Sequence, residues 1–471
     1  MKLATRIAGG AAGVGLAAFL AAPGWAQAAV SPAAVTPTAE MVDKGDTTWM
    51  LISSALVLMM SVPALALFYG GMVRAKNMLS VLMQVLTIVA IASLVWVGWG
   101  YSLAFTGGGP YVGGLSKAFL SGVDATTFAA TFSNGVYIPE YVFVVFQMTF
   151  ACITPALIVG AFAERIKFWP LMAFVVIWLT IVYFPMAHMV WYWAGPDFLP
   201  AAPDDAGLLW GWGALDFAGG TVVHINAGIA GLAGCLVIGK RIGYKTEPMP
   251  PHSLVMTMIG ASLLWIGWFG FNAGSNLEAN GVAALAFINT FVATAAAALT
   301  WALIEQIVHK KPSLLGAATG AVAGLVAITP ASGFGAPMTS ILLGAVASIV
   351  CFFFVTTVKN RLKYDDSLDV FGVHCIGGIV GALGTAIVAD PALGGQGFLD
   401  YTVVPAVPGD YSMGKQIFIQ VEAVGVTLLW SGLVSFVLFL ALDKTVGLRP
   451  SRDAEREGLD INEHGERAYN P

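Results

Sequence analysis

The sequence predicts an all-α polytopic membrane protein with about eleven transmembrane helices. Three observations support this fold class. The chain is 58% hydrophobic and only 10% charged, whereas soluble domains carry about 25% charged residues. Apolar runs of about 20 residues, long enough to cross a bilayer, recur along nearly all of it. Lys and Arg gather in alternate loops, as expected for loops on the cytoplasmic side. A series of soluble domains is therefore excluded, and the net charge of −5 says little about partners.

The first predicted element is an N-terminal secretory signal. Lys2 and Arg6 precede a short apolar core, and residues 26–28 read Ala-Gln-Ala, the A-x-A form of a cleavage site. We expect removal of residues 1–28, with an uncleaved signal anchor as the alternative. In both cases the chain that follows begins outside the cytoplasm.

The transmembrane domain is predicted over residues 29–443. Its expected helices are 47–73, 79–105, 140–163, 169–193, 216–239, 253–274, 282–308, 314–331, 336–358, 370–389 and 413–442. The loops after odd-numbered helices and the tail hold 17 of the 22 basic residues, and the signal holds two. Only Lys44, Lys117 and Lys415 fall on the other side. This alternation predicts an N-out, C-in orientation in the plasma (inner) membrane, with residues 444–471 as a cytoplasmic tail.

Two stretches that each contain a histidine resemble each other. They are "LDFAGGTVVHINAGIAGLAG" (215–234) and "LDVFGVHCIGGIVGALG" (368–384). They open the fifth and tenth expected helices, which cross the membrane in opposite directions. The pattern predicts an inverted five-plus-five repeat with a pathway between its halves. Chance similarity between helices rich in small residues is the alternative.

The histidines in these stretches, His224 and His374, are candidate pathway residues. Ionisable groups at membrane depth usually face a cavity or a partner, and a neutral imidazole can donate and accept hydrogen bonds. A hydrogen-bonded structural role is the alternative for each. Asp216 and Asp369 stand where these helices start and are interpreted first as N-caps. For Asp216, attraction of a cation at the outer mouth is the second interpretation.

Several aromatic side chains lie near the outer ends of the expected helices. Phe146 and Phe150 are four residues apart and share a helix face, and Phe271 and Ser275 have the same spacing. Spacing alone favours packing in the core. Four tryptophans cluster near the outer face, where interfacial tryptophans are common: Trp191, Trp193, Trp210 and Trp212. The four cysteines lie in apolar runs without a CxxC pair, so we expect buried thiols and no metal site.

Taken together, these features resemble the ammonium transporter (Amt/Mep/Rh) family, and its bacterial Amt branch in particular. The resemblance covers the mature chain from about Thr47 to the C-terminus. It rests on seven ordered stretches: "FYGGMVRAKN", "FACITPALIVGAFAERIKF", "AHMVW", "ALDFAGGTVVHINAGIAGLAG", "IGWFGFNAGS", "KPSLLGAATGAVAGLVAITPASG" and "DVFGVHCIGGIVG".

The resemblance implies an outer ammonium site made by Trp191, Phe150 and Ser275, with Asp216 as the aspartate of the family motif. Aromatic faces and a hydroxyl can replace part of the water around an ammonium ion. The segment from Trp191 to Asp216 is longer than is usual in bacterial members, so Trp193 is the alternative to Trp191.

The resemblance further implies a gate and a pore. Two stacked phenylalanines, Phe146 and Phe271, would close the outer vestibule above the paired pore histidines His224 and His374. It also implies a homotrimer with one pore per subunit. The cytoplasmic tail would dock a PII-type signal protein, although a merely solvated tail is the reading that the sequence alone favours.

The expected function is transport of ammonium, with methylammonium as an analogue. Ammonium is recruited and deprotonated outside, and ammonia crosses with or without the proton. We expect no enzymatic activity, no cofactor and no nucleic-acid partner. One alternative is an ammonium sensor with little transport, although sensors commonly carry an appended signalling domain and this tail is under 30 residues. The other is a membrane redox subunit with the histidines as haem ligands.

Overall fold

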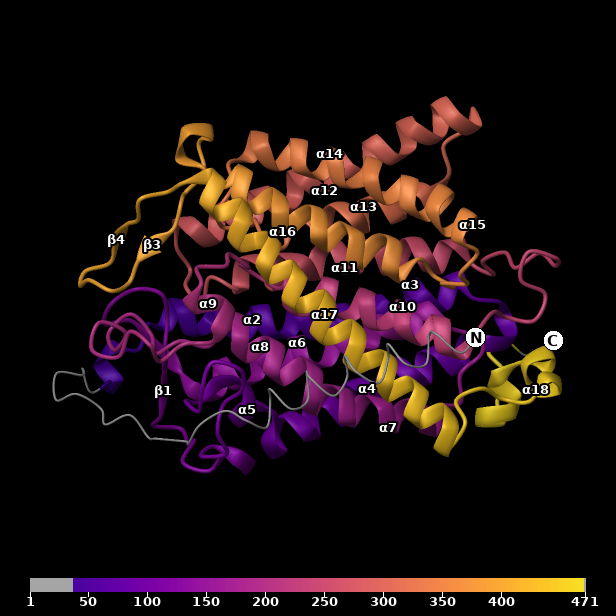
Figure 1. Ribbon diagram of the computed structural model, residues 1–471, viewed down its shortest axis with the longest axis horizontal. Coiled ribbons are helices and arrows are strands. Elements are labelled where there is room, and N and C mark those ends of the chain that lie inside the picture. Colours follow the sequence, from indigo (N-terminus) through magenta and orange to yellow (C-terminus); the bar gives the residue numbers. More distant parts are fainter. Residues whose placement is uncertain (1–36, 470–471) are drawn as a thin grey trace, which may run out of the picture.

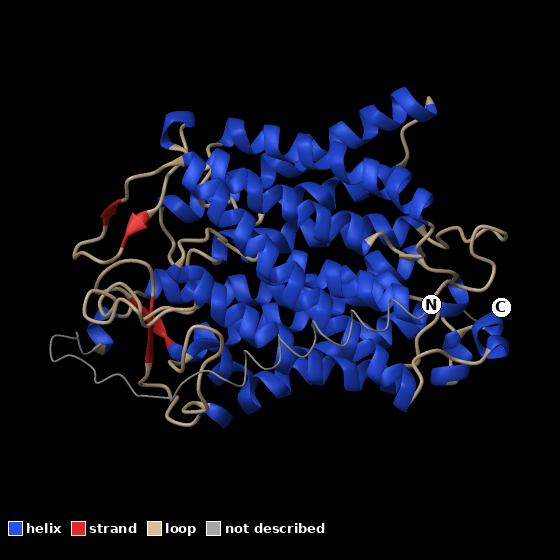
Figure 2. Ribbon diagram, in the orientation of Figure 1, coloured by secondary structure: helices blue, strands red, loops and turns tan. Residues whose placement is uncertain are grey.

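Long helices lying side by side make up most of the chain in the computed structural model, which describes residues 37–469 (Figure 1). The expected signal at residues 1–28 lies outside the described residues. Two short antiparallel hairpins lie at one end of the bundle (Figure 2), pairing β1 (Phe128–Ala130) with β2 (Tyr137–Pro139) and β3 (Leu399–Asp400) with β4 (Val407–Pro408). We call this end the outer end and the opposite one, where the C-terminus lies, the tail end.

The helices have the following bounds. They are α2 (Lys44–Met59), α3 (Leu65–Met72), α4 (Met78–Val95), α5 (Tyr101–Phe105), α6 (Glu140–Ile158), α7 (Phe168–Trp178), α8 (Phe184–Trp191), α9 (Leu208–Gly211), α10 (Asn226–Ile238), α11 (Leu254–Gly274), α12 (Gly281–His309), α13 (Leu314–Ile328), α14 (Pro337–Phe353), α15 (Lys359–Leu362), α16 (Ile376–Val388), α17 (Met413–Thr445) and α18 (Arg452–Glu457).

Ten helical segments among the described residues are long and apolar enough to cross a membrane. Several are pairs of helices joined by a single irregular turn, such as α2 with α3 and α7 with α8. The eighth expected helix, 314–331, differs from the others, because α13 has only 15 residues. At 1.5 Å per residue it is about 22 Å long, less than the roughly 30 Å of a hydrocarbon core. The all-helical membrane fold is confirmed, while the count of eleven spans stays a prediction.

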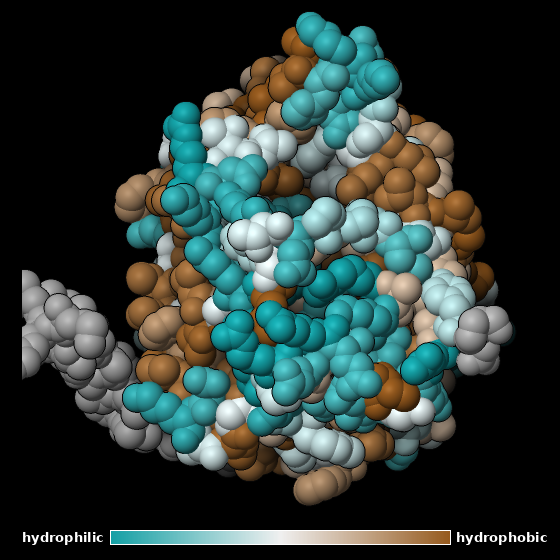
Figure 3. All heavy atoms as spheres, turned by 90° about the vertical axis from the view of Figure 1, so that its right-hand side faces the viewer, coloured by the Kyte–Doolittle hydropathy of each residue, from teal (hydrophilic) through white to brown (hydrophobic). Residues whose placement is uncertain are grey.

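The sides of the bundle are apolar and its tail end is polar. Large hydrophobic side chains are exposed on the outward sides of the helices, including Leu94, Val255 and Leu429. Seen from the tail end, hydrophilic residues gather in the centre and hydrophobic residues form the flanks (Figure 3). Helices with apolar surfaces on their outward sides are those of a protein surrounded by lipid.

The two histidine stretches have the same local structure. Each begins with a turn of π-helix, Gly220–Ile225 or Phe371–Cys375, and continues as a regular helix, α10 or α16. π-Helical turns inside helices are rare and frequent at functional sites. Five other π-helical turns occur among the described residues. What the two stretches share is that the turn at the start of the helix holds the histidine.

A glycine four residues after each histidine lets the two stretches meet. A Cβ at Gly228 would lie 2.4 Å from the backbone N of Cys375, and one at Gly378 would lie 3.1 Å from the carbonyl O of Gly220. Each missing side chain therefore gives room to the other stretch. The close contact between the two histidine stretches depends on these glycines, as helix contacts in membranes often depend on small residues.

Gly228→Ala is expected to destabilise the protein by about 1–3 kcal/mol, because the added methyl group has no room and the two stretches must move apart. Thermal unfolding of the purified protein measures the change. Gly425→Ala on α17 is the matched control, since nothing lies within 4 Å of a Cβ at that position. Equal unfolding temperatures for the two variants would contradict this account of the crossing.

Candidate functional site

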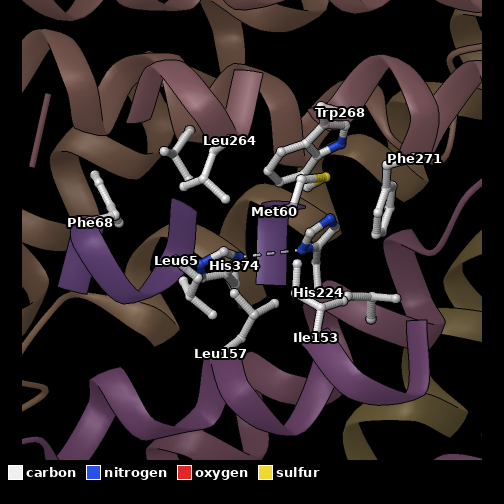
Figure 4. Close-up of a pocket in the computed structure, with 12 residues that line it drawn as sticks. Met60, Leu65, Phe68, Ile153, Leu157, His224, Leu264, Trp268, Phe271 and His374 are labelled. Carbon is white, nitrogen blue, oxygen red and sulfur yellow. Dashed lines mark hydrogen bonds between the residues drawn. The ribbon is translucent and has the colours of Figure 1, made fainter. Parts of the chain in front are cut away.

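The structure brings His224 and His374 into direct contact in the centre of the bundle. The two Nδ1 atoms are 3.3 Å apart, and the ring centroids are 5.4 Å apart with planes inclined by 18° (Figure 4). Both side chains are buried. A nitrogen that accepts must face one that donates, so the pair shares one proton between the two rings.

The histidines border a narrow cavity whose other walls are apolar. Its volume is about 10 Å³, roughly the space that holds one water-sized molecule. Figure 4 shows the apolar side chains around the imidazoles. The lining residues are Met60, Leu65, Phe68, Ile153, Leu157, Val223, His224, Leu264, Trp268, Phe271, Val322 and His374. Because no charged side chain lines it, the cavity suits a small neutral molecule better than an ion.

The ring of His224 is held on one side and has an unpartnered nitrogen. Its ring stacks on Trp268 at 5.4 Å with an interplanar angle of 18°. The Trp268 indole is fixed in turn, because its Nε1 donates to Thr329 Oγ1 at 2.8 Å. The buried Nε2 of His224 has no hydrogen-bond partner within residues 37–469. Such an orphaned polar atom in a native interior calls for an explanation, and a transient ligand is one.

Trp268 was missed in the sequence. The signal that could have found it is its spacing, because Trp268 precedes Phe271 by three residues and therefore shares its face of α11. That face is the one that looks onto the cavity, where both residues are found.

Above the cavity, the stacked aromatic pair is Phe150 with Phe271. Their ring centroids are 4.3 Å apart at an interplanar angle of 30°. The expected partner of Phe271, Phe146, instead lies edge-on against Phe150 at 5.0 Å. The reason is local packing: Phe146 is one turn farther out on α6 and is fully buried next to Gly274, whose absent side chain gives its ring room.

Trp191 and Ser275 lie on the outer side of this pair. The Trp191 ring is perpendicular to that of Phe150, with centroids 5.7 Å apart, and its Nε1 donates to the carbonyl O of Asp216 at 3.0 Å. Ser275 Oγ donates to the carbonyl O of Phe271 at 2.8 Å, which leaves its lone pairs for another donor. Trp191, Phe150 and Ser275 all line an outer cavity of about 1060 Å³.

Trp193 belongs to a different aromatic cluster. Its ring is stacked between Phe132, at 6.0 Å, and Trp210, at 5.1 Å. Trp193 also packs against Tyr401 at 4.7 Å, so three aromatic rings surround its indole. The geometry therefore supports Trp191 over Trp193 at the outer site.

The Asp216 carboxylate caps the His224 stretch. Its two oxygens accept hydrogen bonds from the backbone N–H groups of Gly219, Gly220, Thr221 and Val222, at 2.8, 2.6, 2.8 and 3.3 Å, and from the Thr221 hydroxyl. These are the orphan donors of a helix start. A carboxylate with so many donors is held in place, so the side chain acts on the site through the backbone that it positions.

The second capping aspartate is Asp366, and the expectation of Asp369 was wrong. Asp366 accepts from the backbone N–H groups of Val370 at 3.1 Å and Phe371 at 2.8 Å. It precedes His374 by eight residues, as Asp216 precedes His224. Asp369 instead pairs with Lys359 at 2.5 Å. Burial raises the pKa of the Asp366 carboxyl to about 7, although Lys359 opposes the shift.

The tail folds back on the tail end through its carboxylates. Asp460 accepts from the backbone N–H of Ser80 at 2.8 Å, at the start of α4. Glu463 accepts from that of Phe168 at 3.2 Å, at the start of α7. Carboxylates at helix N-termini are favourable because they meet unpaired N–H groups and the positive end of the helix dipole. The tail is thus part of the folded unit.

Comparison with sequence families gives one match over most of the chain. The Ammonium Transporter Family matches residues 48–469. An ammonium transporter of Bacillus subtilis (strain 168) is 45% identical over 430 residues, which are 90% of this chain and 98% of that protein. An ammonium transporter of Aquifex aeolicus (strain VF5) is 45% identical over 436 residues, 91% of this chain and 94% of that protein.

Solved structures give the same result. Saccharomyces cerevisiae Mep2 superposes with a TM-score of 0.76 at 32% identity, over 88% of this chain and 92% of that one. A structure described as a sensor Amt protein gives a TM-score of 0.78 at 28% identity, over 89% of this chain and 98% of that one. A structure described as a sensor therefore shares the fold of this chain.

Proposed function

Since the chain belongs to the ammonium transporter family, we propose that it conducts ammonia through the cavity at His224 and His374 after ammonium loses a proton outside. Its relatives are transporters and not enzymes, and it is itself a multi-pass membrane protein for ammonium transport. The route, the residues and the protonation step are the content of the proposal.

The observation that carries this proposal is the paired imidazoles in a closed apolar cavity. A charged side chain at the bilayer centre costs at least about 2.5–3.5 kcal/mol on insertion scales, and much more in simulations. Ammonia avoids this cost, because it is neutral and about the size of water. The shared proton of the pair and the unpartnered Nε2 of His224 give the molecule polar contacts along an otherwise apolar path. Potassium has no proton to lose, so the same path rejects it.

The outer site would hold the cation before it loses its proton. The face of the Trp191 indole and the ring of Phe150 attract a cation, and the Ser275 hydroxyl accepts one of its N–H groups. Phe150 and Phe271, stacked at 4.3 Å, separate this site from the cavity. We assign the gate to this pair, with Phe146 packed behind Phe150. Asp216 supports the site by fixing the carbonyl that receives the Trp191 N–H.

The assembly and its regulation are also part of the proposal. Apolar sides fit a homotrimer in the plasma (inner) membrane, with the tail end in the cytoplasm. Tail carboxylates reach the starts of α4 and α7, so a PII-type signal protein that displaced the tail would act directly on these helices. Crosslinking of the detergent-purified protein and co-purification with a PII protein test the two statements.

Ammonium-limited growth of a host that lacks its own ammonium transporters tests the function. We expect the chain to restore growth and to support uptake of labelled methylammonium. Membrane expression without growth or uptake would favour the sensor. The haem alternative has no support in the geometry, because the two imidazoles are hydrogen-bonded to each other and leave no space between them for an iron.

Trp191→Leu is expected to raise the half-saturating methylammonium concentration about 2- to 30-fold, because a cation–π contact is worth about 0.5–2 kcal/mol. Uptake measured over a range of methylammonium concentrations gives this value. Trp193→Leu is the matched control and should change it less. A larger effect at Trp193 would transfer the outer site to that residue.

A further inference from the structure

A second cluster suited to an ammonium group lies at the mouth of the outer cavity. Glu140, at the start of α6, is buried, with only 3% of its side chain exposed. Its Oε1 accepts a hydrogen bond from the Tyr101 hydroxyl at 2.6 Å and is also contacted by Nζ of Lys117. The carboxylate of Glu140 therefore already binds an ammonium group, that of the chain's own lysine.

Aromatic rings complete the cluster. Lys117 Nζ lies 5.8 Å from the centroid of the Tyr101 ring. Phe143 lies against Tyr101 and Phe105, with ring centroids 6.4 and 5.0 Å apart. A carboxylate, a phenol and ring faces are the groups that recognise an alkylammonium ion. The five residues of the cluster line the same outer cavity as Trp191 and Ser275.

The side chain of Lys117 is free to leave this position. Its side chain is 35% exposed. The backbone N–H of Lys117 donates to Ser102 Oγ at 3.0 Å, so the loop is attached without the side chain. A long, flexible lysine at the border of a cavity can turn its charged end into water. The Glu140 carboxylate would then be open to another cation.

The cluster also lies outward of the outer site along α6. Glu140, Phe143, Gln147 and Phe150 share one face of α6, and all four line the outer cavity. Ten residues separate Glu140 from Phe150, which places the cluster about 15 Å outward along the helix. A cation held by Glu140 therefore lies at the entrance of a continuous row of cavity-lining residues.

We propose that Glu140, Tyr101 and Phe143 form an outer subsite for ammonium and small alkylammonium ions, and that Lys117 occupies it as a tethered competitor. The nature of the ligand rests on the proposed function, but binding at this subsite does not depend on conduction through the pore. Displacement of Lys117 by an external ammonium ion exchanges one cation for another at the same carboxylate, so the charge of the site is unchanged.

The test compares binding of methylammonium by purified Lys117→Met and by the double variant Lys117→Met/Glu140→Gln. In thermal unfolding, methylammonium chloride is expected to raise the Tm of Lys117→Met by about 2 °C more than that of the double variant. Sodium and potassium chloride at equal ionic strength correct for salt. Lys415→Met, which removes an exposed lysine of the same cavity, should behave as the unchanged chain. Equal shifts for the single and double variants would overturn the proposal.

A second measurement uses the unchanged protein and remains decisive if the variants fail to fold. Methylammonium should increase the acylation rate of Lys117 by an amine-reactive reagent at least twofold, measured by mass spectrometry, because the displaced lysine is more exposed. Acylation of Lys415 is the internal control. No increase at Lys117, up to the highest methylammonium concentration at which the protein stays folded, would overturn the proposal. Loss of transport in pore variants changes neither the Tm shift nor the acylation rate. The subsite proposal and the proposed function can therefore fail independently of each other.

Discussion

His224→Leu is expected to reduce methylammonium uptake at least tenfold while the protein still folds and reaches the membrane. A leucine fills a similar volume but removes the hydrogen bond to His374 and the unpartnered Nε2. The conducted molecule would then have only the His374 imidazole as a polar partner in an otherwise apolar cavity, and a lost hydrogen bond in such a place costs about 1–3 kcal/mol. A loss of about 1.4 kcal/mol already corresponds to the tenfold reduction.

The control for this prediction is His309→Leu, which changes an exposed histidine at the end of α12. That variant should retain normal uptake. If His224→Leu kept both the uptake and the selectivity of the unchanged chain, the histidine pair would have no part in conduction.

Asp216→Ala is expected to lower the free energy of unfolding by at least about 3 kcal/mol and to abolish uptake. The substitution leaves the N–H groups of Gly219, Gly220 and Thr221 without their acceptor in a buried position, and each such group costs about 1–3 kcal/mol. It also releases the backbone that holds the Trp191 indole. Thermal unfolding and uptake assays on the same preparations measure the two effects.

Asp216→Asn separates the cap from the charge, because one oxygen acceptor remains while the negative charge is removed. An intermediate stability is expected. Asp390→Ala is the matched control, since Asp390 caps only the short turn Pro391–Leu393 through one exposed hydrogen bond. If Asp216→Ala unfolded at the same temperature as Asp390→Ala, the capping account would be wrong.

Most of the fold follows from the sequence because lipid imposes one simple rule. A backbone in hydrocarbon must satisfy its own hydrogen bonds, so each long apolar run becomes a helix. The limits of the expected helices agree with the structure within a few residues. The expected end of α13 at residue 331 lies three residues past its observed end, because apolar composition continues past residue 328 into a turn.

The sequence identifies the rare polar residues of the site, but it does not show how they are arranged. His224 and His374 are conspicuous as rare polar groups, but the Leu-Asp pair common to the two stretches points to Asp369. The spacing to the histidine is eight residues in both halves, and this spacing selects Asp366. The capping residue must lie beside unpaired backbone N–H groups. Sequence similarity between the two stretches does not ensure this position.

The aromatic residues show the same limit. Phe146 and Phe150 share a face of α6, so spacing alone gives either one as the partner of Phe271. The choice depends on the empty space at Gly274, a residue of another helix. Trp268 is not recognisable in the sequence for a related reason, because a tryptophan in an apolar helix is equally expected in a packed core. Only the contacts between helices show which of these aromatic residues lie together at the site.

The most direct test of the central claim is the selectivity of the purified protein in proteoliposomes. We predict that an inward ammonium gradient drives transport, that an equal potassium gradient does not, and that excess potassium leaves ammonium transport unchanged. Solid-supported-membrane electrophysiology together with pH-sensitive dyes inside the vesicles records charge and proton movement. Potassium currents comparable to those of ammonium would contradict conduction of a deprotonated species through the histidine pair.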